Sequence, residues 1–139
     1  MRYFALDFET GNASPLSACA LGVSIFEDGR LVGEHVSLLK PPACAGKFHW
    51  GNVRVNHIKE NMVQDAPSFA SFWRELAPLA EGSVLVAHNA MFDTGAPDAA
   101  VLADTIGMRM GRISSMGKTP CSIAKNTIEK RRTRAKRNL

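Results

Sequence analysis

The stretch FALDFETGN, residues 4 to 12, places two carboxylates inside an otherwise apolar run. Its apolar residues form a nearly continuous run, which is typical of a central strand rather than a half-exposed edge strand. Asp7 and Glu9 interrupt that run two positions apart, and such residues point to the same face of a strand. Two like charges held that close repel each other, so the pair favours a hard divalent cation such as Mg²⁺ or Mn²⁺ between them. For an isolated pair of acids the commoner arrangement is two solvated carboxylates on an edge strand, but the apolar run argues against it.

Length and composition limit the remaining possibilities. A chain of 139 residues with 45% hydrophobic content supports one globular domain with a real core. No apolar stretch approaches the length of a membrane span and the N-terminus does not resemble a signal peptide, so we expect a soluble cytoplasmic protein with no membrane partner. The three cysteines are widely spaced and form no C-x-x-C pair, which argues against disulfides and zinc and predicts buried thiols at Cys19, Cys44 and Cys121.

The net charge of +4 is concentrated at one end of the chain. Residues 125–139 carry seven basic side chains and one acid, a local charge of +6, so the rest of the chain sums to −2. We therefore predict a domain over residues 1–124 and a basic tail over residues 125–139. Such a tail suits phosphate contacts, and a solvated, disordered terminus is an equally good interpretation.

The pattern along the chain predicts a sheet with a helical crossover. Residues 19–26 and 31–39 are expected to be strands joined at Asp28-Gly29, a strong hairpin signal, so the chain opens with an antiparallel three-strand meander. Residues 43–57 show no clear period and are expected to be a loop. Ser68 is expected to cap a helix that closes at residues 81–83, with an apolar face formed by Phe69, Phe72, Trp73, Leu76 and Leu79. Residues 84–87 then form a short buried strand, parallel to the first because a helix crosses over between them.

That last strand leads into AHNAMFD, residues 87–93, at its carboxyl end, which is the usual place for a site in an open sheet. Asn89 is expected to cap the next helix, with Asp93 about one turn into it. An acid there also complements the helix dipole, so Asp93 taken alone has a structural explanation as good as a catalytic one. His88 is expected to orient a neighbouring group or to pack, rather than to act as a metal ligand. Together, the acids of the first strand and one after a parallel strand can converge on one metal site.

Several segments in the right order resemble one family. They are FALDFETGN (4–12), SACALGVSIFEDGRLVGEHVSLLKPP (17–42), VNHIKENMVQDAPSFASFW (55–73) and VLVAHNAMFD (84–93). Together they resemble the DEDD superfamily of 3′-5′ exonucleases, in particular bacterial proteins similar to the epsilon proofreading subunit of DNA polymerase III. The resemblance implies an α/β, ribonuclease H-like fold: a mixed sheet, with the antiparallel meander and parallel strands, flanked by helices.

The resemblance also implies the site and its ligands. Asp7, Glu9 and Asp93 would be three of four carboxylates that hold two Mg²⁺ or Mn²⁺ ions, which activate water and stabilise the leaving 3′-oxygen. The substrate would be single-stranded nucleic acid, with DNA favoured, and a DNA polymerase would be a possible partner. The backbone at Thr10 and Gly11 would lie near the terminal nucleotide, with His88 and Asn89 beside it. Phe8 or Met91 would wedge against its base or sugar, although both are equally good core residues.

One family feature is missing from the sequence. The family completes its site with a His or Tyr a few residues before a fourth Asp, well downstream of the second motif. No His or Tyr follows Asp93 here, and the acids that do, Asp98, Asp104 and Glu129, do not stand in that frame. The basic tail resembles nothing in the family, so we expect the C-terminal part of the fold to be incomplete, by truncation or a shifted reading frame.

Three functions stay open at this point. The first is a metal-dependent 3′-5′ exonuclease of the DNA replication and repair type, with activity reduced by the missing base and ligand. The second is a catalytically inactive, nucleic-acid-binding remnant of that family. The third is an actin-like phosphate-binding module, which Glu9 argues against because a carboxylate would face the phosphates.

Overall fold

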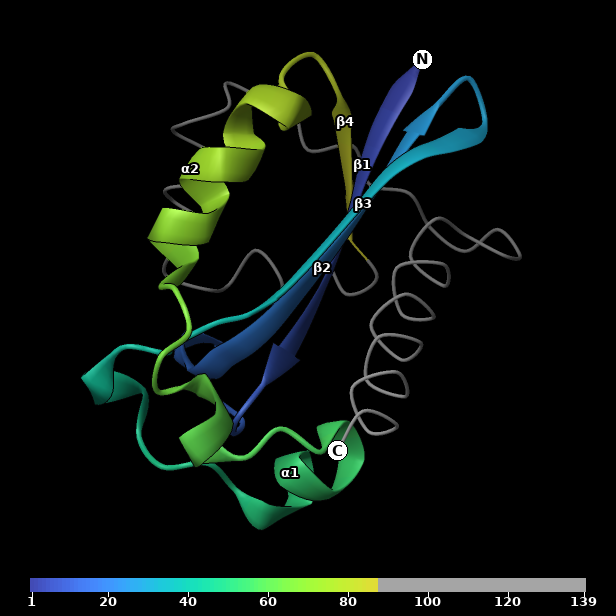
Figure 1. Cartoon of the computed structure of the whole chain (residues 1–139). Helices are drawn as coiled ribbons and strands as arrows, with labels where there is room; N and C mark the ends of the chain where they lie inside the picture. The colour runs from blue at the N-terminus through green and yellow to red at the C-terminus, as the bar shows by residue number, and fades with distance from the viewer. Residues whose placement is uncertain (88–139) are drawn as a thin grey trace, which may run out of the picture.

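The computed structural model describes residues 1–87 as a mixed four-stranded sheet with helices beside it (Figure 1). The strands lie in the order β3-β2-β1-β4. Strand β1 pairs antiparallel with β2 and parallel with β4, as the sequence predicted. Several predictions lie outside the described residues: the helix capped by Asn89, the residues His88, Met91, Asp93 and Cys121, the boundary at residue 124 and the basic tail. The elements are β1 (Arg2–Thr10), β2 (Ala18–Glu27), β3 (Arg30–Leu38), α1 (Trp50–Asn56), α2 (Phe69–Ala80) and β4 (Val84–Ala87), with short 3-10 turns at Pro15–Ser17, Ala43–Ala45 and Glu60–Val63.

The β2–β3 hairpin turns at the predicted pair of residues. Asp28 and Gly29 both have positive φ, 47° and 79°, which is the backbone that a two-residue type I′ turn requires. Met1 donates its terminal ammonium protons to the Asp28 carboxylate, and this ion pair lowers the pKa of that exposed side chain. The hairpin places β2 between its two antiparallel neighbours, so the predicted meander is confirmed.

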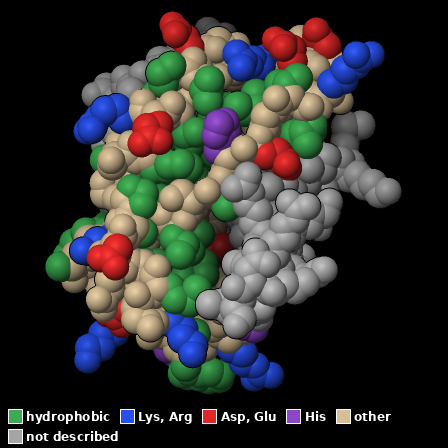
Figure 2. Space-filling model, in the orientation of Figure 1, with side chains coloured by type: hydrophobic (Ala, Val, Ile, Leu, Met, Phe, Trp, Pro, Cys, Tyr) green, Lys and Arg blue, Asp and Glu red, His purple; other side chains and the backbone are tan. Residues whose placement is uncertain are grey.

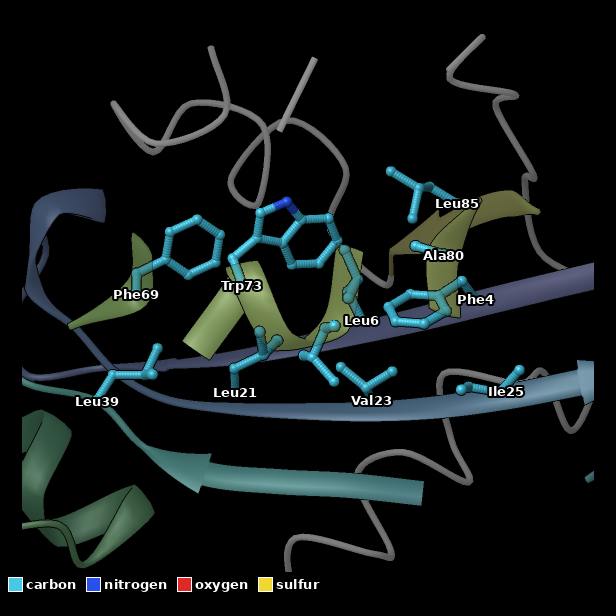
Figure 3. Packing of buried hydrophobic residues seen from close by; sticks show 11 residues of the cluster. Phe4, Leu6, Leu21, Val23, Ile25, Leu39, Phe69, Trp73, Ala80 and Leu85 are labelled. Atoms are coloured by element: carbon cyan, nitrogen blue, oxygen red, sulfur yellow. The ribbon is translucent and has the colours of Figure 1, made fainter. Parts of the chain in front are cut away.

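The main core lies between the sheet and α2 (Figure 3). Trp73 is its centre: the indole stacks on Phe69 with ring centroids 5.9 Å apart and meets Phe4 edge-on at 6.0 Å. Ser68 caps the helix as predicted, since its hydroxyl accepts a hydrogen bond from the Ser71 N–H at 3.2 Å. The predicted apolar face is confirmed, with Phe69, Trp73 and Leu76 buried and Phe72 and Leu79 packed against the same cluster.

Two sequence expectations are wrong. Residues 43–57 are not simply a loop, because they contain the turn at Ala43–Ala45 and the two-turn helix α1. A helix of seven residues leaves too short a window for apolar periodicity, and its ends are set by caps: His49 accepts from the Gly51 N–H, and His57 adopts a left-handed conformation with φ of 58°. Cys19 is buried as predicted, but Cys44 is exposed because it lies in the turn before α1.

Candidate functional site

The two acids of β1 lie on the face of the sheet opposite α2. Phe4 and Leu6 pack in the cluster beneath α2, whereas Ala5 packs with Phe26 and Val86 in a separate cluster. Because side chains alternate along a strand, Asp7 and Glu9 continue the face of Ala5. Asp7 is only 6% exposed and Glu9 is half-buried. The sequence prediction that both carboxylates share one face of a central strand is therefore consistent with the backbone.

Small residues stand opposite both acids on the neighbouring strand. Asp7 pairs with Gly22 and Glu9 pairs with Ala20, so no large β2 side chain covers either carboxylate from that side. The register shifts directly after Glu9, and such irregularities in a sheet re-aim side chains next to functional sites. At these two paired positions, β2 therefore places no large side chain beside the carboxylates.

Helix α1 is fastened to the end of β1 by two asparagine side chains. The Asn56 amide donates to the Thr10 carbonyl at 2.9 Å, and the Asn52 amide donates to the same carbonyl at 3.2 Å. Asn56 is 3% exposed and also accepts from the Ile58 N–H at 3.0 Å, which ends the helix. These bonds fix the strand end one residue beyond Glu9.

Gly11 is the point of closest approach between β1 and the segment before α1. A Cβ added there would lie 2.5 Å from Phe48 Cδ1 and Cε1, so only glycine lets the Phe48 ring lie over this backbone. The Gly11 carbonyl accepts from the His49 N–H at 2.7 Å, and its own N–H donates to Ser17 O at 2.8 Å. Thr10 and Gly11 are both buried. Their predicted place beside a terminal nucleotide stays a prediction.

Asn12 extends the same set of contacts. Its side-chain amide donates to the carbonyls of Ala45 and Lys47 at 2.8 and 3.0 Å, and its Oδ1 accepts from Ser14 N. These supporting residues were not predicted. Asn52 and Asn56 are four residues apart and hence on one helix face, but that spacing alone does not predict a helix.

Phe8 points to the other face of the sheet from the acids. Its ring lies 5.7 Å from that of Phe69, and it lines a cavity of about 400 Å³ together with Leu16, Pro41 and Ala70. The predicted contact of Phe8 with a base or sugar stays a prediction.

The donor set suits a hard cation. Carboxylate oxygens are the ligands that Mg²⁺ and Mn²⁺ prefer, and Asp7 and Glu9 offer them from one rigid strand. Within residues 1–87, no group of three or more His, Cys, Asp or Glu side chains gathers in a way that would hold a metal. The predicted third ligand, Asp93, lies outside the described residues.

Comparison with known proteins finds similarity to exonucleases and to DNA polymerase III proteins. A family model described as "Exonuclease" matches residues 4–101. A DNA polymerase III subunit epsilon-like protein from Rhodobacter capsulatus is 37% identical over 86 residues, 62% of this chain and 12% of that protein. A PolC-type DNA polymerase III from Thermotoga petrophila is 29% identical over 93 residues, 66% of this chain and 7% of that protein. The chain thus spans only about a tenth of the length of these two relatives.

Solved structures show the same fold. Exonuclease X in complex with 5′ overhanging duplex DNA aligns with a TM-score of 0.54 at 20% identity, over 91% of this chain and 89% of that one. Product-bound exonuclease I aligns with a TM-score of 0.59 at 16% identity, over 68% of this chain and 24% of that one.

Among the helices of residues 1–87, none is long and apolar enough to span a bilayer.

Proposed function

This chain belongs to the exonuclease family, and on that premise we propose that it is a metal-dependent 3′-5′ exonuclease acting on single-stranded DNA ends. The observation that carries the proposal is the placement of buried Asp7 and half-buried Glu9 on one face of the central strand, at its carboxyl end. The names of the two DNA polymerase III relatives and the DNA complex of exonuclease X support DNA as the substrate.

Asp7, Glu9 and Asp93 are the residues that would hold Mg²⁺ or Mn²⁺ in this proposal. When bound, two such ions supply an activated water and charge stabilisation for the leaving 3′-oxygen. The chain itself contributes the fixed position of the carboxylates. Strand β1 is paired on both sides, and α1 fixes its end through the Thr10 and Gly11 backbone, so the carboxylates are preorganised.

The rate is expected to be lower than that of a family member with a complete site. A general base contributes about 10² to 10⁴ in rate, and no His or Tyr follows Asp93 in these 139 residues to act as one. Water or another group must then accept the proton. A polymerase partner and a cytoplasmic location belong to the same proposal and rest on the names of the relatives.

The test is digestion of a 5′-labelled single-stranded oligonucleotide with Mg²⁺ or Mn²⁺. We expect a ladder that shortens from the 3′ end and that disappears with EDTA or in the Asp7→Asn variant. Glu27→Gln is the matched control, because this exposed acid lies at the far end of β2. A ladder that persists unchanged in Asp7→Asn would overturn the proposal.

A second function is favoured by the sequence after Asp93, which lacks the family's third motif. In that case the chain is a non-catalytic nucleic-acid-binding protein whose basic tail contacts phosphates. Folded protein that binds the oligonucleotide but cleaves it with neither ion would support this function over the first.

A further inference from the structure

Charge is strongly segregated in the described part of the chain. Between Glu34 and Glu60 the sequence carries four basic side chains, three histidines and no acid. The rest of residues 1–87 carries nine acids and only three basic side chains. The basic segment contains α1 and the turn before it. In Figure 2, Lys, Arg and His side chains accordingly gather with hydrophobic ones at the lower end of the molecule, where Figure 1 places α1.

The same segment exposes an aromatic ring. Trp50, the first residue of α1, is 69% exposed, whereas the other tryptophan, Trp73, is 2% exposed. The His49 ring lies beside it, with centroids 5.6 Å apart. Arg54 is exposed four positions later, so it projects from the same side of the helix as Trp50. Lys47 is exposed just before His49. We call Lys47, His49, Trp50 and Arg54 the α1 platform.

The α1 platform lies close to the acids of β1. The His49 N–H donates to the carbonyl of Gly11, two residues after Glu9, and Asn52 and Asn56 bond to Thr10. The strand end that follows the carboxylates is therefore hydrogen-bonded directly to the base of the platform. A polymer that reaches the carboxylates can continue onto the platform.

We propose that the α1 platform binds single-stranded nucleic acid outside the cleavage site, with one base stacked on Trp50 and a phosphate at Arg54. Exposed aromatic rings combined with a basic surface are the means by which proteins bind single strands without sequence preference. Charge complementarity favours a polyanion as the ligand, since the platform lies in the one acid-free segment of residues 1–87 longer than twenty residues. This inference rests on the proposed function, because it assigns the path of that substrate.

The test measures binding without cleavage. The full chain, carrying Asp7→Asn and kept in EDTA, is titrated into a fluorescent oligo-dT, and its dissociation constant is compared with that of variants in the same background. Trp50→Ala is expected to weaken binding about 5- to 150-fold, the range of one base–aromatic stack, and Trp50→Phe to restore most of it. Arg54→Ala is expected to lower the slope of log K against log salt by about 0.7, one phosphate contact on a single strand.

Val55→Ala is the matched control. Val55 is 77% exposed on the same helix, but it lies about 140° around the axis from Trp50, so its truncation should leave affinity unchanged. Intrinsic fluorescence adds a second readout, because Trp50 is the exposed one of the chain's two tryptophans. Oligo-dT should quench the long-wavelength emission and should not do so in Trp50→Ala.

Equal affinities of Trp50→Ala and Val55→Ala would overturn the inference and leave the platform to another partner, such as an acidic protein surface. Because neither ions nor cleavage enter the measurement, this failure is distinct from failure of the nuclease proposal. Conversely, a wild-type chain that binds the oligonucleotide but does not cleave it would refute only the nuclease proposal.

Discussion

Replacing Gly11 by alanine tests whether the contact between β1 and the Phe48 ring supports the site. The new methyl group would lie 2.5 Å from two ring carbons of Phe48 and 2.8 Å from a third. Carbon atoms in contact prefer about 3.5–4.0 Å, so the ring must retreat by about 1 Å. The Gly11 backbone cannot yield instead, because both its N–H and its carbonyl are hydrogen-bonded.

The expected magnitude follows from two opposing terms. Overpacking costs about 1–3 kcal/mol, and here it pushes Phe48 away from the cluster of Ala20, Ile58 and Val63. Replacing glycine by alanine restricts the unfolded chain and returns about 0.4–1 kcal/mol. The free energy of unfolding should therefore fall by about 1–2 kcal/mol, which lowers the urea midpoint by roughly 0.5–1 M.

Urea denaturation followed by tryptophan fluorescence measures this change. Gly33→Ala is the matched control, because its Cβ would meet Ile25 Cδ1 at 3.4 Å, an ordinary contact, and its midpoint should not fall. Trimming the ring in Phe48→Leu should remove most of the additional cost of Gly11→Ala. A wild-type midpoint for Gly11→Ala, or an equal loss with and without the Phe48 substitution, would show that the Phe48 ring does not restrict this position.

Three further variants test other contacts, each by urea denaturation. Asn56→Ala should lower the free energy of unfolding by about 1–3 kcal/mol, because the hydrogen bonds of the buried amide to Thr10 O and Ile58 N are lost. A wild-type urea midpoint would contradict these hydrogen bonds. Ser68→Ala should cost about 0.5–2 kcal/mol through loss of the α2 cap, whereas Ser71→Ala, which keeps the capped N–H, should cost less. Trp73→Ala should cost about 3–5 kcal/mol and Trp73→Phe less, and equal losses would argue against the central position of the indole.

Elements with strong local signals could be predicted from the sequence. The Asp28-Gly29 turn, the Ser68 cap and the apolar spacing of α2 each have a mechanism that acts within a few residues. The parallel pairing of β4 with β1 followed from the crossover rule, and the register confirms it. The alternation of side chains along a strand predicted that both acids of β1 share one face, and the core clusters of that strand are consistent with it.

Helix α1 could not be predicted because its stability does not come from its own pattern. It is held by hydrogen bonds that the side-chain amides of Asn52 and Asn56 donate to the carbonyl of Thr10, more than forty residues earlier in the chain. The contact of Gly11 with Phe48 is equally non-local. Such partners are visible only once the fold has brought the segments together. The metal ligand set stays a proposal for the same reason, since its third predicted member, Asp93, lies outside the described residues.

Titration with Mn²⁺ followed by electron paramagnetic resonance tests directly whether the β1 carboxylates bind a divalent cation, as the proposed function requires. The full chain should bind Mn²⁺, and Asp7→Asn and Glu9→Gln should each weaken that binding, whereas Glu27→Gln should not. Equal Mn²⁺ affinity in the wild type, Asp7→Asn and Glu9→Gln, with all three folded, would show that these carboxylates do not bind the cation.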